Sequence, residues 1–316
     1  METAMSRSGT DARPEPAGPL FLVGAPRSGT TLLYKALCLH ADAAWISNWV
    51  GHFPRLVVLA RLNRLASRFP KWRRAAWFGT DANAYVFGSK RTAAARMFPM
   101  PVEGGPLFAR FGFNNRSSTA SESAPSGGVQ IEALQEAFEA IRYHSGAPVL
   151  ISKRIINNRQ IAELAQAFPS ARFVELVRDG RAVAYSLSRV DWWEDSVVWW
   201  CGSTPRQWRE RGGDPWELAA RHWPEELAVI HRGLAAVAPA RVMQVRYESL
   251  VAAPRSTLDQ IAGFAGLRYS EAWKSEVARL AFRDRNEEWQ SHLDAAVVRR
   301  IEALQHERLR QFGYVG

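Results

Sequence analysis

Cysteine is scarce in this chain. Its 316 residues include only two cysteines, Cys38 and Cys201, and neither belongs to a CxxC pair or a histidine-rich cluster. Such a sequence cannot build a disulfide scaffold and offers no zinc-binding spacing, so we expect no metal site. Cys38 lies in an apolar helical pattern, which predicts a buried thiol.

Long hydrophobic runs are missing as well. A membrane-spanning helix needs about 18 apolar residues without charges, and the longest candidate, Leu56–Ala66, contains Arg61 and Arg64. Residues 1–18 are rich in Ser, Pro, Gly and charge and lack the apolar centre of a signal peptide, so they predict a disordered tail. We therefore expect a cytoplasmic protein without a transmembrane segment, in which residues 19–316 form a single domain.

Acidic residues are too few to balance the basic ones. The chain has 41 Lys and Arg against 31 Asp and Glu, a net charge of +10. A positive surplus favours anionic partners, which include nucleic acid, acidic lipid and phosphorylated ligands. The arginines are spread along the chain and form no polybasic block, which argues against nucleic acid.

Short apolar runs and amphipathic patterns alternate along the chain. Strands are predicted where runs of four to seven apolar or β-favouring residues occur, at 20–23, 149–152, 172–177 and 241–247. Helices are predicted at 29–39, 52–68, 129–143, 158–168, 181–189, 254–265 and 294–311, and loops around a pocket at 80–128. This alternation predicts an α/β fold with a central parallel sheet flanked by helices on both faces.

A glycine-containing loop follows the first predicted strand. The segment Gly24–Thr31 reads GAPRSGTT and opens a helix, which is the context that a phosphate-binding loop requires. The backbone N–H groups at a helix N-terminus attract anions, and glycines allow the backbone to approach them closely. The Walker pattern has Lys where this chain has Thr30, and the cation here, Arg27, comes earlier. The loop therefore suits an anion shorter than a triphosphate.

The loop resembles the 5′-phosphosulfate loop of sulfotransferases that use 3′-phosphoadenosine-5′-phosphosulfate (PAPS). It is most similar to the broad bacterial branch related to tyrosylprotein and carbohydrate sulfotransferases. The resemblance implies a P-loop-like sulfotransferase fold, with PAPS as the sulfuryl donor and 3′-phosphoadenosine-5′-phosphate (PAP) as the product. It also implies that the phosphosulfate is held by Pro26, Arg27, Ser28, Gly29, Thr30 and Thr31.

A second segment resembles the 3′-phosphate motif of the same family. In Phe173–Ser186 a predicted strand is followed by a turn and a helix start, and Arg178 and Ser186 occupy the two phosphate-binding positions of the family motif. A guanidinium fork and a hydroxyl group form a suitable phosphate clamp. The family often has Pro where this chain has Gly180, and either residue serves a turn.

The C-terminal part resembles the family more loosely. Val245–Pro254 is similar to a late strand followed by a Tyr-Glu-x-Leu turn, which adds Tyr247 to the residues implied to bind the nucleotide. Arg283–Trp289 resembles the region that closes over the nucleotide, and both Arg283 and Arg285 fit the position of its arginine.

Sulfuryl transfer needs cations near the transferred group and a base for the acceptor hydroxyl. Arg27 and Lys153 are the candidate cations, and the position of Lys153 at a strand end is similar to that of a Lys in relatives. Tyrosylprotein-type relatives have a Glu shortly after the first helix, but here Ala44–Trp49 contains no carboxylate. His52, whose intrinsic pKa suits proton removal, is the first candidate base, and Glu103 in a Gly/Pro loop is the second.

The acceptor side is expected in residues 41–143, together with a tryptophan-rich stretch after Ser186 that extends from Trp192 to Trp223. A carbohydrate, a lipid-linked molecule, a natural product and a peptide tyrosine all remain open as acceptors. Two alternative functions remain. A P-loop nucleotide-dependent kinase is disfavoured by Thr30 and by the lack of a clear acidic Mg²⁺ ligand after a core strand. A non-enzymatic nucleic-acid-binding protein is suggested only by charge.

Overall fold

The computed structural model describes residues 18–78, 96–113 and 129–316. The predicted tail therefore lies outside the described residues, except for Gly18, as does most of the predicted loop region 80–128. No helix of the described ranges is long and apolar enough to cross a membrane.

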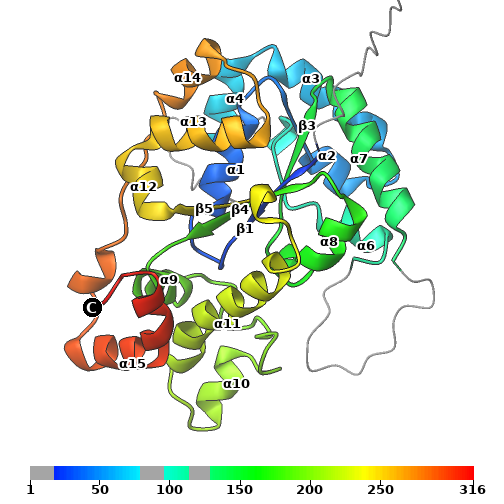
Figure 1. Ribbon diagram of the computed structural model, residues 1–316. Helices are drawn as coiled ribbons and strands as arrows, with labels where there is room; N and C mark the ends of the chain where they lie inside the picture. The colour runs from blue at the N-terminus through cyan, green and yellow to red at the C-terminus, as the bar shows by residue number, and fades with distance from the viewer. Residues whose placement is uncertain (1–17, 79–95, 114–128) are drawn as a thin grey trace, which may run out of the picture.

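A five-stranded, all-parallel sheet forms the centre of the molecule (Figure 1). The strand order is β2-β3-β1-β4-β5, so the first strand of the chain lies in the middle. The predicted parallel α/β fold is confirmed. Of these strands only β2, three residues long, was not predicted from the sequence. The strands are β1 (Leu20–Val23), β2 (Ala43–Trp45), β3 (Val149–Lys153), β4 (Arg172–Val177) and β5 (Val242–Arg246).

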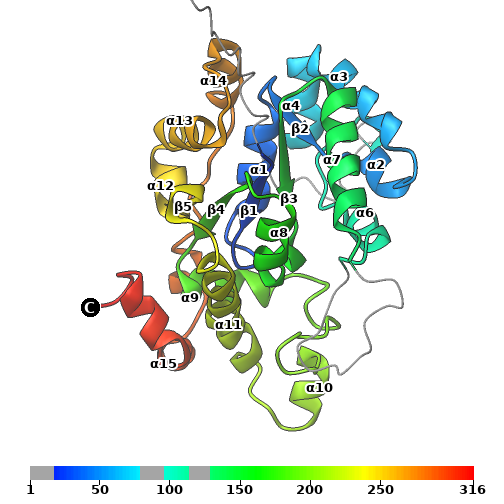
Figure 2. The ribbon, with the colours of Figure 1, turned by 45° about the vertical axis from the view of Figure 1, so that its right-hand side comes forward.

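Side chains of β1 alternate between two apolar layers, one on each face of the sheet. Leu20 and Leu22 belong to one buried cluster, whereas Phe21 and Val23 belong to the other. Each fully buried side chain of this size stabilises the fold by roughly 1.5–3 kcal/mol. The Leu20 face is covered by α1 (Thr30–Cys38), α13 (Pro254–Ala265) and α14 (Glu271–Val277); the Phe21 face is covered by α7 (Ile131–Ser145), α8 (Ile161–Ala167) and α11 (Glu217–Leu234) (Figure 2).

The other helices surround these layers. The predicted helix at 52–68 begins only at Val57, because Pro54 lacks the N–H group that a helix interior requires. The predicted helix at 158–168 is a 3₁₀ turn followed by α8. The remaining elements are α2 (Asn48–His52), η1 (Val57–Ala60), α3 (Arg61–Ser67), α4 (Pro70–Phe78), α6 (Gly105–Arg110), η3 (Ile155–Arg159), α9 (Gly180–Leu187), α10 (Pro205–Glu210), η4 (Pro239–Arg241), α12 (Tyr247–Ala252), η5 (Glu288–Ser291) and α15 (Ala295–Gln311).

The chain order reverses at the centre of the sheet. From β1 the chain passes to the outer strand β2 and returns through β3, whereas β4 and β5 lie on the other side of β1. At such a switch point the loops after neighbouring strands diverge and leave a crevice at the carboxyl ends of the strands. The segments after β1, β3 and β4 are those that carry Arg27, the Lys153 strand end and Arg178.

Candidate active site

The loop after β1 has a strained, closely packed backbone. Ser28 N donates to Ala25 O (3.1 Å), and Arg27 has φ 70°, which makes it the one non-glycine residue with positive φ in the described ranges. Gly29, with φ 92°, caps the N-terminus of α1. A Cβ atom at Gly29 would lie 2.7 Å from the ring of Tyr247, so only glycine fits here. This conformation exposes the N-terminus of α1 to a cavity.

A buried amide anchors the start of the loop. Asn158 Oδ1 accepts from Gly24 N (3.3 Å), and Asn158 Nδ2 donates to Gly24 O (2.9 Å) and to Glu226 Oε2 (2.7 Å). Glu226, on α11, is fully buried and also accepts from Trp199 Nε1 (2.7 Å). Burial raises the pKa of this carboxyl group. The loop is thus held by a polar network that sequence reasoning did not identify.

A cavity of about 960 Å³ lies at the carboxyl edge of the sheet. It brings together residues of both phosphate motifs, the Glu103–Lys153 pair and part of the tryptophan-rich stretch. Among its lining residues are Pro26, Arg27, Gly29, Thr30, Thr31, Glu103, Lys153, Arg178, Tyr185, Ser186, Trp192, Trp193, Trp199 and Arg285.

The two phosphate motifs contact one another at this cavity. Arg27 Nε donates to Ser186 Oγ (3.0 Å), and Arg178 Nη1 donates to Arg27 O (3.0 Å). Arg178 Nη2 also donates to Arg285 O (2.7 Å), which places the C-terminal segment beside both motifs. A concentration of guanidinium groups and a helix N-terminus can bind two anionic groups of one ligand.

The remaining nucleotide candidates lie behind this wall. Tyr247 is buried, with its ring 4.4 Å from the guanidinium carbon of Arg178, and its hydroxyl donates to Arg283 O (3.3 Å). Neither Tyr247 nor Arg283 lines the cavity, whereas Arg285 does. Ser28, within the loop, is buried, and its Oγ has no hydrogen-bond partner among the described residues. An unsatisfied buried hydroxyl in a glycine cradle fits a loop that closes around a phosphate or sulfate group.

Glu103 and Lys153 form an ion pair in the cavity wall. Lys153 Nζ donates to Glu103 Oε1, and Glu103 Oε2 accepts from Ile155 N (3.3 Å). The Lys153 side chain is buried and that of Glu103 is half exposed. The position of Lys153 at the edge of the sheet can be predicted from the sequence because Lys153 ends a buried strand. The position of Glu103 depends on contacts with residues far from it in the chain.

A short non-local pairing positions Glu103. Val102 N donates to Ile46 O (3.0 Å), and Tyr34 Oη donates to Val102 O (3.3 Å). Gly104 has φ 66°, and a Cβ atom there would lie 2.7 Å from Ile46. The segment before α6 is therefore fixed against the end of β2, with the Glu103 carboxylate directed at Lys153.

His52 lies elsewhere. It ends α2 with an exposed side chain, its Nδ1 is 2.7 Å from Asn48 O, and it does not line the cavity. The structure thus places only the second of the two candidate bases beside the phosphate loop.

Only part of the tryptophan-rich stretch faces the cavity. Trp192, Trp193 and Trp199 line it, whereas Trp223 is fully buried against Gly180. A Cβ atom at Gly180 would clash with the Trp223 ring, so this position requires glycine.

Several lining residues were missed in the sequence, among them Arg159 and His222. Arg159 lies over the Trp199 ring (5.1 Å) and donates to Glu226 Oε1 (3.3 Å). His222 is buried on α11, with Nε2 3.7 Å from Glu226 Oε1, and burial lowers the pKa of its imidazole to about 3. The polar run Asn157–Gln160 directly after β3 was the available signal for Arg159, but nothing local marked His222.

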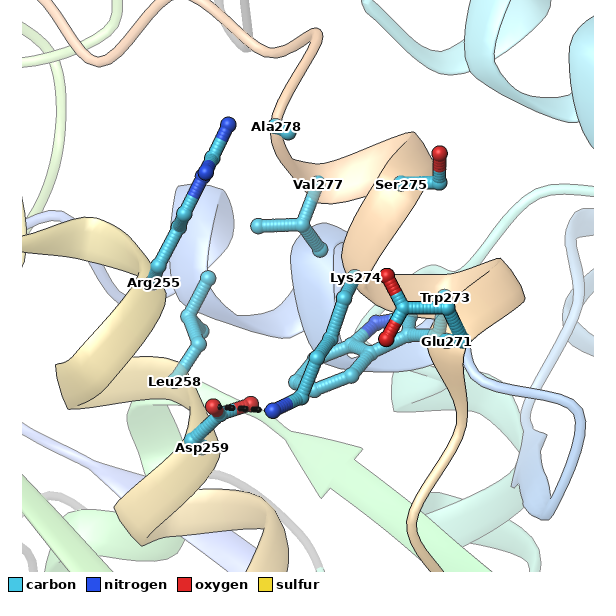
Figure 3. A pocket seen from close by; sticks show the side chains of 9 residues that line it. All are labelled: Arg255, Leu258, Asp259, Glu271, Trp273, Lys274, Ser275, Val277 and Ala278. Atoms are coloured by element: carbon cyan, nitrogen blue, oxygen red, sulfur yellow. Dashed lines mark ion pairs between the residues drawn. The ribbon is translucent and has the colours of Figure 1, made fainter.

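A second, smaller cavity of about 340 Å³ lies between α13 and α14 (Figure 3). Its main polar feature is an ion pair between Lys274 Nζ and Asp259 Oδ2 (2.6 Å). Leu258, Trp273 and Val277, which line it, belong to the core cluster on this face of the sheet. None of the motifs singled out in the sequence contributes to this cavity.

Comparison with known families assigns the chain. A profile described as the sulfotransferase family matches residues 19–271, which is most of the chain and includes both phosphate motifs. Among solved structures, the sulfotransferase STF9 from Mycobacterium avium matches with a TM-score of 0.56 and 16% sequence identity, covering 94% of this chain and 77% of that one. The sulfotransferase STF1 from Mycobacterium tuberculosis matches with a TM-score of 0.53 and 16% identity, covering 92% and 75%. At this identity the structural likeness concerns the fold.

Proposed function

The chain belongs to the sulfotransferase family, and from that premise we propose that it transfers a sulfuryl group from PAPS to a hydroxyl group of an acceptor. The observation that carries the proposal is the joining of the α1 N-terminus, Arg178 with Ser186, and the Glu103–Lys153 pair in one cavity. Two anion sites and an acid–base pair in one cavity match the needs of a donor with a phosphosulfate and a separate phosphate.

The donor would be held at both ends. In this proposal the loop residues Arg27, Gly29, Thr30 and Thr31 bind the 5′-phosphosulfate, and Arg178 with Ser186 binds the 3′-phosphate. Support comes from the Arg27–Ser186 hydrogen bond, which sets the two sites side by side. Arg285, also in the wall, is our choice over Arg283 for the arginine of the closing segment.

Glu103 is the proposed general base. The acceptor oxygen attacks the sulfur atom, the bond from sulfur to the bridging phosphate oxygen breaks with its electrons passing to PAP, and the hydroxyl proton passes to Glu103. Lys153 orients the carboxylate through their ion pair, and its ammonium group, like Arg27, can stabilise negative charge that develops during transfer. His52 does not line this cavity among the described residues.

The acceptor would occupy the part of the cavity that is lined by tryptophan side chains. Trp192, Trp193 and Trp199 can pack against a sugar ring, an aromatic ring or an alkyl chain, which keeps carbohydrate, lipid-linked and natural-product acceptors open. A panel of such acceptors incubated with PAPS, analysed by mass spectrometry for an added sulfuryl group, tests the reaction. A parallel incubation with ATP and Mg²⁺ that gave phosphorylated products instead would favour the kinase.

We expect PAP to bind more tightly than AMP or ATP, and Arg178→Ala to weaken PAP binding by about 10- to 150-fold, since losing a charge-assisted contact costs about 1.5–3 kcal/mol. AMP, which lacks the 3′-phosphate, should be affected much less. Isothermal titration of both ligands measures this.

Because Arg178 also bonds to Arg27 O and Arg285 O, Ser186→Ala is a second variant that leaves those contacts in place and removes only the acceptor of the Arg27 Nε hydrogen bond. The control is Arg299→Ala, at an exposed position of α15. Equal losses for PAP and AMP in both site variants would refute the assignment of this pair to the 3′-phosphate.

A further inference from the structure

An exposed surface at the β2 edge of the sheet combines cations with large apolar side chains. It runs from the end of α2 through η1 and α3 into α4. We call it the basic apolar surface and define it as Phe53, Arg55, Leu56, Val58, Arg61, Arg64, Leu65, Arg68, Phe69, Lys71 and Trp72, all of which are exposed.

Its apolar side chains are unusually concentrated. Among the described residues, eleven large hydrophobic side chains are exposed, and six of them lie between Phe53 and Trp72. Trp72 is 69% exposed, and Leu56 and Leu65 are each about half exposed. Isolated exposed apolar residues are ordinary, whereas a cluster marks a surface that another apolar body covers.

Its charge has one sign. The chain contains 31 acidic residues, yet none occurs between Asp42 and Asp81. None of Arg55, Arg61, Arg64, Arg68 and Lys71 forms an ion pair with an acidic residue in the described ranges. The acidic side chains on elements packed against η1, α3 and α4 are Glu132, Glu136 and Glu139 of α7 and Glu271 and Glu276 of α14, and of these Glu139 is paired with Arg142 and Glu276 with Arg74.

The exposed cations of this surface are not the ones that attach its helices to the rest of the molecule. Other arginines of α4 anchor it to the molecule: Arg73 donates to Leu39 O (2.8 Å) and Cys38 O (3.2 Å), and Arg74 pairs with Glu276 (2.9 Å). The buried face of α3 is held by Asn63, which donates to Trp45 O (2.8 Å). The outward residues are therefore displayed by a fixed scaffold and contribute little to its stability.

We propose that the basic apolar surface docks onto an anionic lipid bilayer. A headgroup layer with negative charge accepts the arginine and lysine side chains, while Phe, Leu and Trp side chains enter the boundary of the acyl chains. Nucleic acid would complement the cations but would leave the apolar side chains between them without a partner.

Sedimentation of the full chain with vesicles tests the proposal. We expect binding to vesicles of phosphatidylcholine mixed with phosphatidylglycerol, weakening as salt is raised, and little binding to phosphatidylcholine alone. Arg61→Glu with Arg68→Glu should lower the partition coefficient by about tenfold or more, because each cation near an anionic surface favours binding by a factor of about five. Leu65→Ser with Trp72→Ser should lower it similarly through the apolar part.

A matched control keeps the test specific. Arg299→Glu with Arg310→Glu makes the same change of net charge on exposed positions of α15, which lies at the opposite end of the molecule from α3 and α4 (Figures 1 and 2). This variant should retain binding within about twofold, since it lies beyond the screening length.

Several outcomes would overturn the proposal. They are equal binding to neutral and anionic vesicles, an equal loss in the α15 control, and full binding by both surface variants. Competition also discriminates: if duplex DNA binds through Arg61 and Arg68 and anionic vesicles do not displace it, the surface is a nucleic-acid site instead.

Discussion

At the scale of single residues, the pairing of Glu103 with Lys153 has a direct kinetic consequence. Glu103→Gln keeps the shape of the side chain but removes the carboxylate that we propose as the proton acceptor. We expect the single-turnover rate of sulfuryl transfer to fall by about 10²- to 10⁴-fold, as is typical for loss of an acid–base group, with PAP affinity nearly unchanged. Rapid-quench measurements with saturating PAPS give the rate, and titration with PAP gives the affinity.

His52→Ala is the comparison for this variant. Because His52 is exposed and outside the cavity, its removal should leave the single-turnover rate within about twofold of the unmodified enzyme. A large loss in His52→Ala combined with a near-normal Glu103→Gln enzyme would restore the histidine as the base. Loss in both would mean that neither residue is the sole proton acceptor.

The two residues also show where sequence reasoning ends. Lys153 could be located because it ends a buried strand, a local and periodic signal. Glu103 could not be ranked, since its place depends on the bond from Val102 N to Ile46 O and on close contact between Gly104 and Ile46. His52 ranked first on its intrinsic pKa, a property that says nothing about distance from the cavity.

At the scale of elements, the phosphate loop owes its conformation to Gly29. An alanine there combines positive φ with overlap of the Tyr247 ring. We expect Gly29→Ala to cost about 1–3 kcal/mol of unfolding free energy and to abolish high-affinity PAP binding, since the α1 N-terminus shifts. Urea unfolding and PAP titration measure the two effects.

Gly263→Ala provides the matched control in helix α13. A Cβ atom at Gly263 would meet nothing within 4 Å, so alanine should stabilise the helix by about 0.5–1 kcal/mol and leave PAP binding unchanged. A Gly29→Ala protein that binds PAP as the control does would show that the loop tolerates another conformation.

Local elements were predictable and α11 was not. Short apolar runs predict the strands β1 and β4, and glycines predict the turns that follow them. Helix α11 has apolar residues at helical spacing, but Pro224 lies inside it, where proline normally disfavours a helix, and His222 and Glu226 are buried among its apolar residues. The buried Glu226 carboxylate accepts from Asn158, which in turn bonds to Gly24 of the phosphate loop. Because α11 was not predicted, this contact of the loop was not predicted either.

At the scale of the whole molecule, the buried imidazole of His222 makes stability depend on pH. Its pKa in the folded state is about 3, against an ordinary value of 6.5, because burial disfavours the cation. The unfolded chain therefore takes up a proton that the folded chain refuses. Above pH 6.5 the imidazole is neutral in both states, and His222 does not lower the free energy of unfolding. As the pH falls from 6.5 towards 3, protonation of the unfolded chain lowers the free energy of unfolding by at most about 1.4 kcal/mol per pH unit.

We expect this part of the pH dependence to disappear in His222→Gln, whose amide oxygen can still accept from Trp200 Nε1. Urea unfolding at several pH values between 7.5 and 5 gives the free energies. The advantage of the unmodified chain over the variant should shrink as the pH falls. His306→Gln, at an exposed position of α15, controls for removal of a histidine. Parallel curves for the unmodified chain and His222→Gln would contradict the expectation.

The overall architecture could be predicted because alternation of strands and helices permits few arrangements. Four of the five strands and the parallel sheet follow from apolar runs in the sequence. The short strand β2 and the surroundings of α2 and α6 could not be predicted, because three residues carry no periodic signal and their pairing partners are distant.

The central place of β1 also fixes when the molecule can assemble. Leu20 pairs with Ile151 on one side and with Arg172 on the other. The first strand of the chain therefore cannot pair until segments more than a hundred residues later have been synthesised. Closing such long loops makes folding slow relative to that of a helical bundle of equal length. During synthesis the apolar β1 segment therefore has no sheet to join until β3 and β4 have left the ribosome, and chaperone capture is expected in that interval.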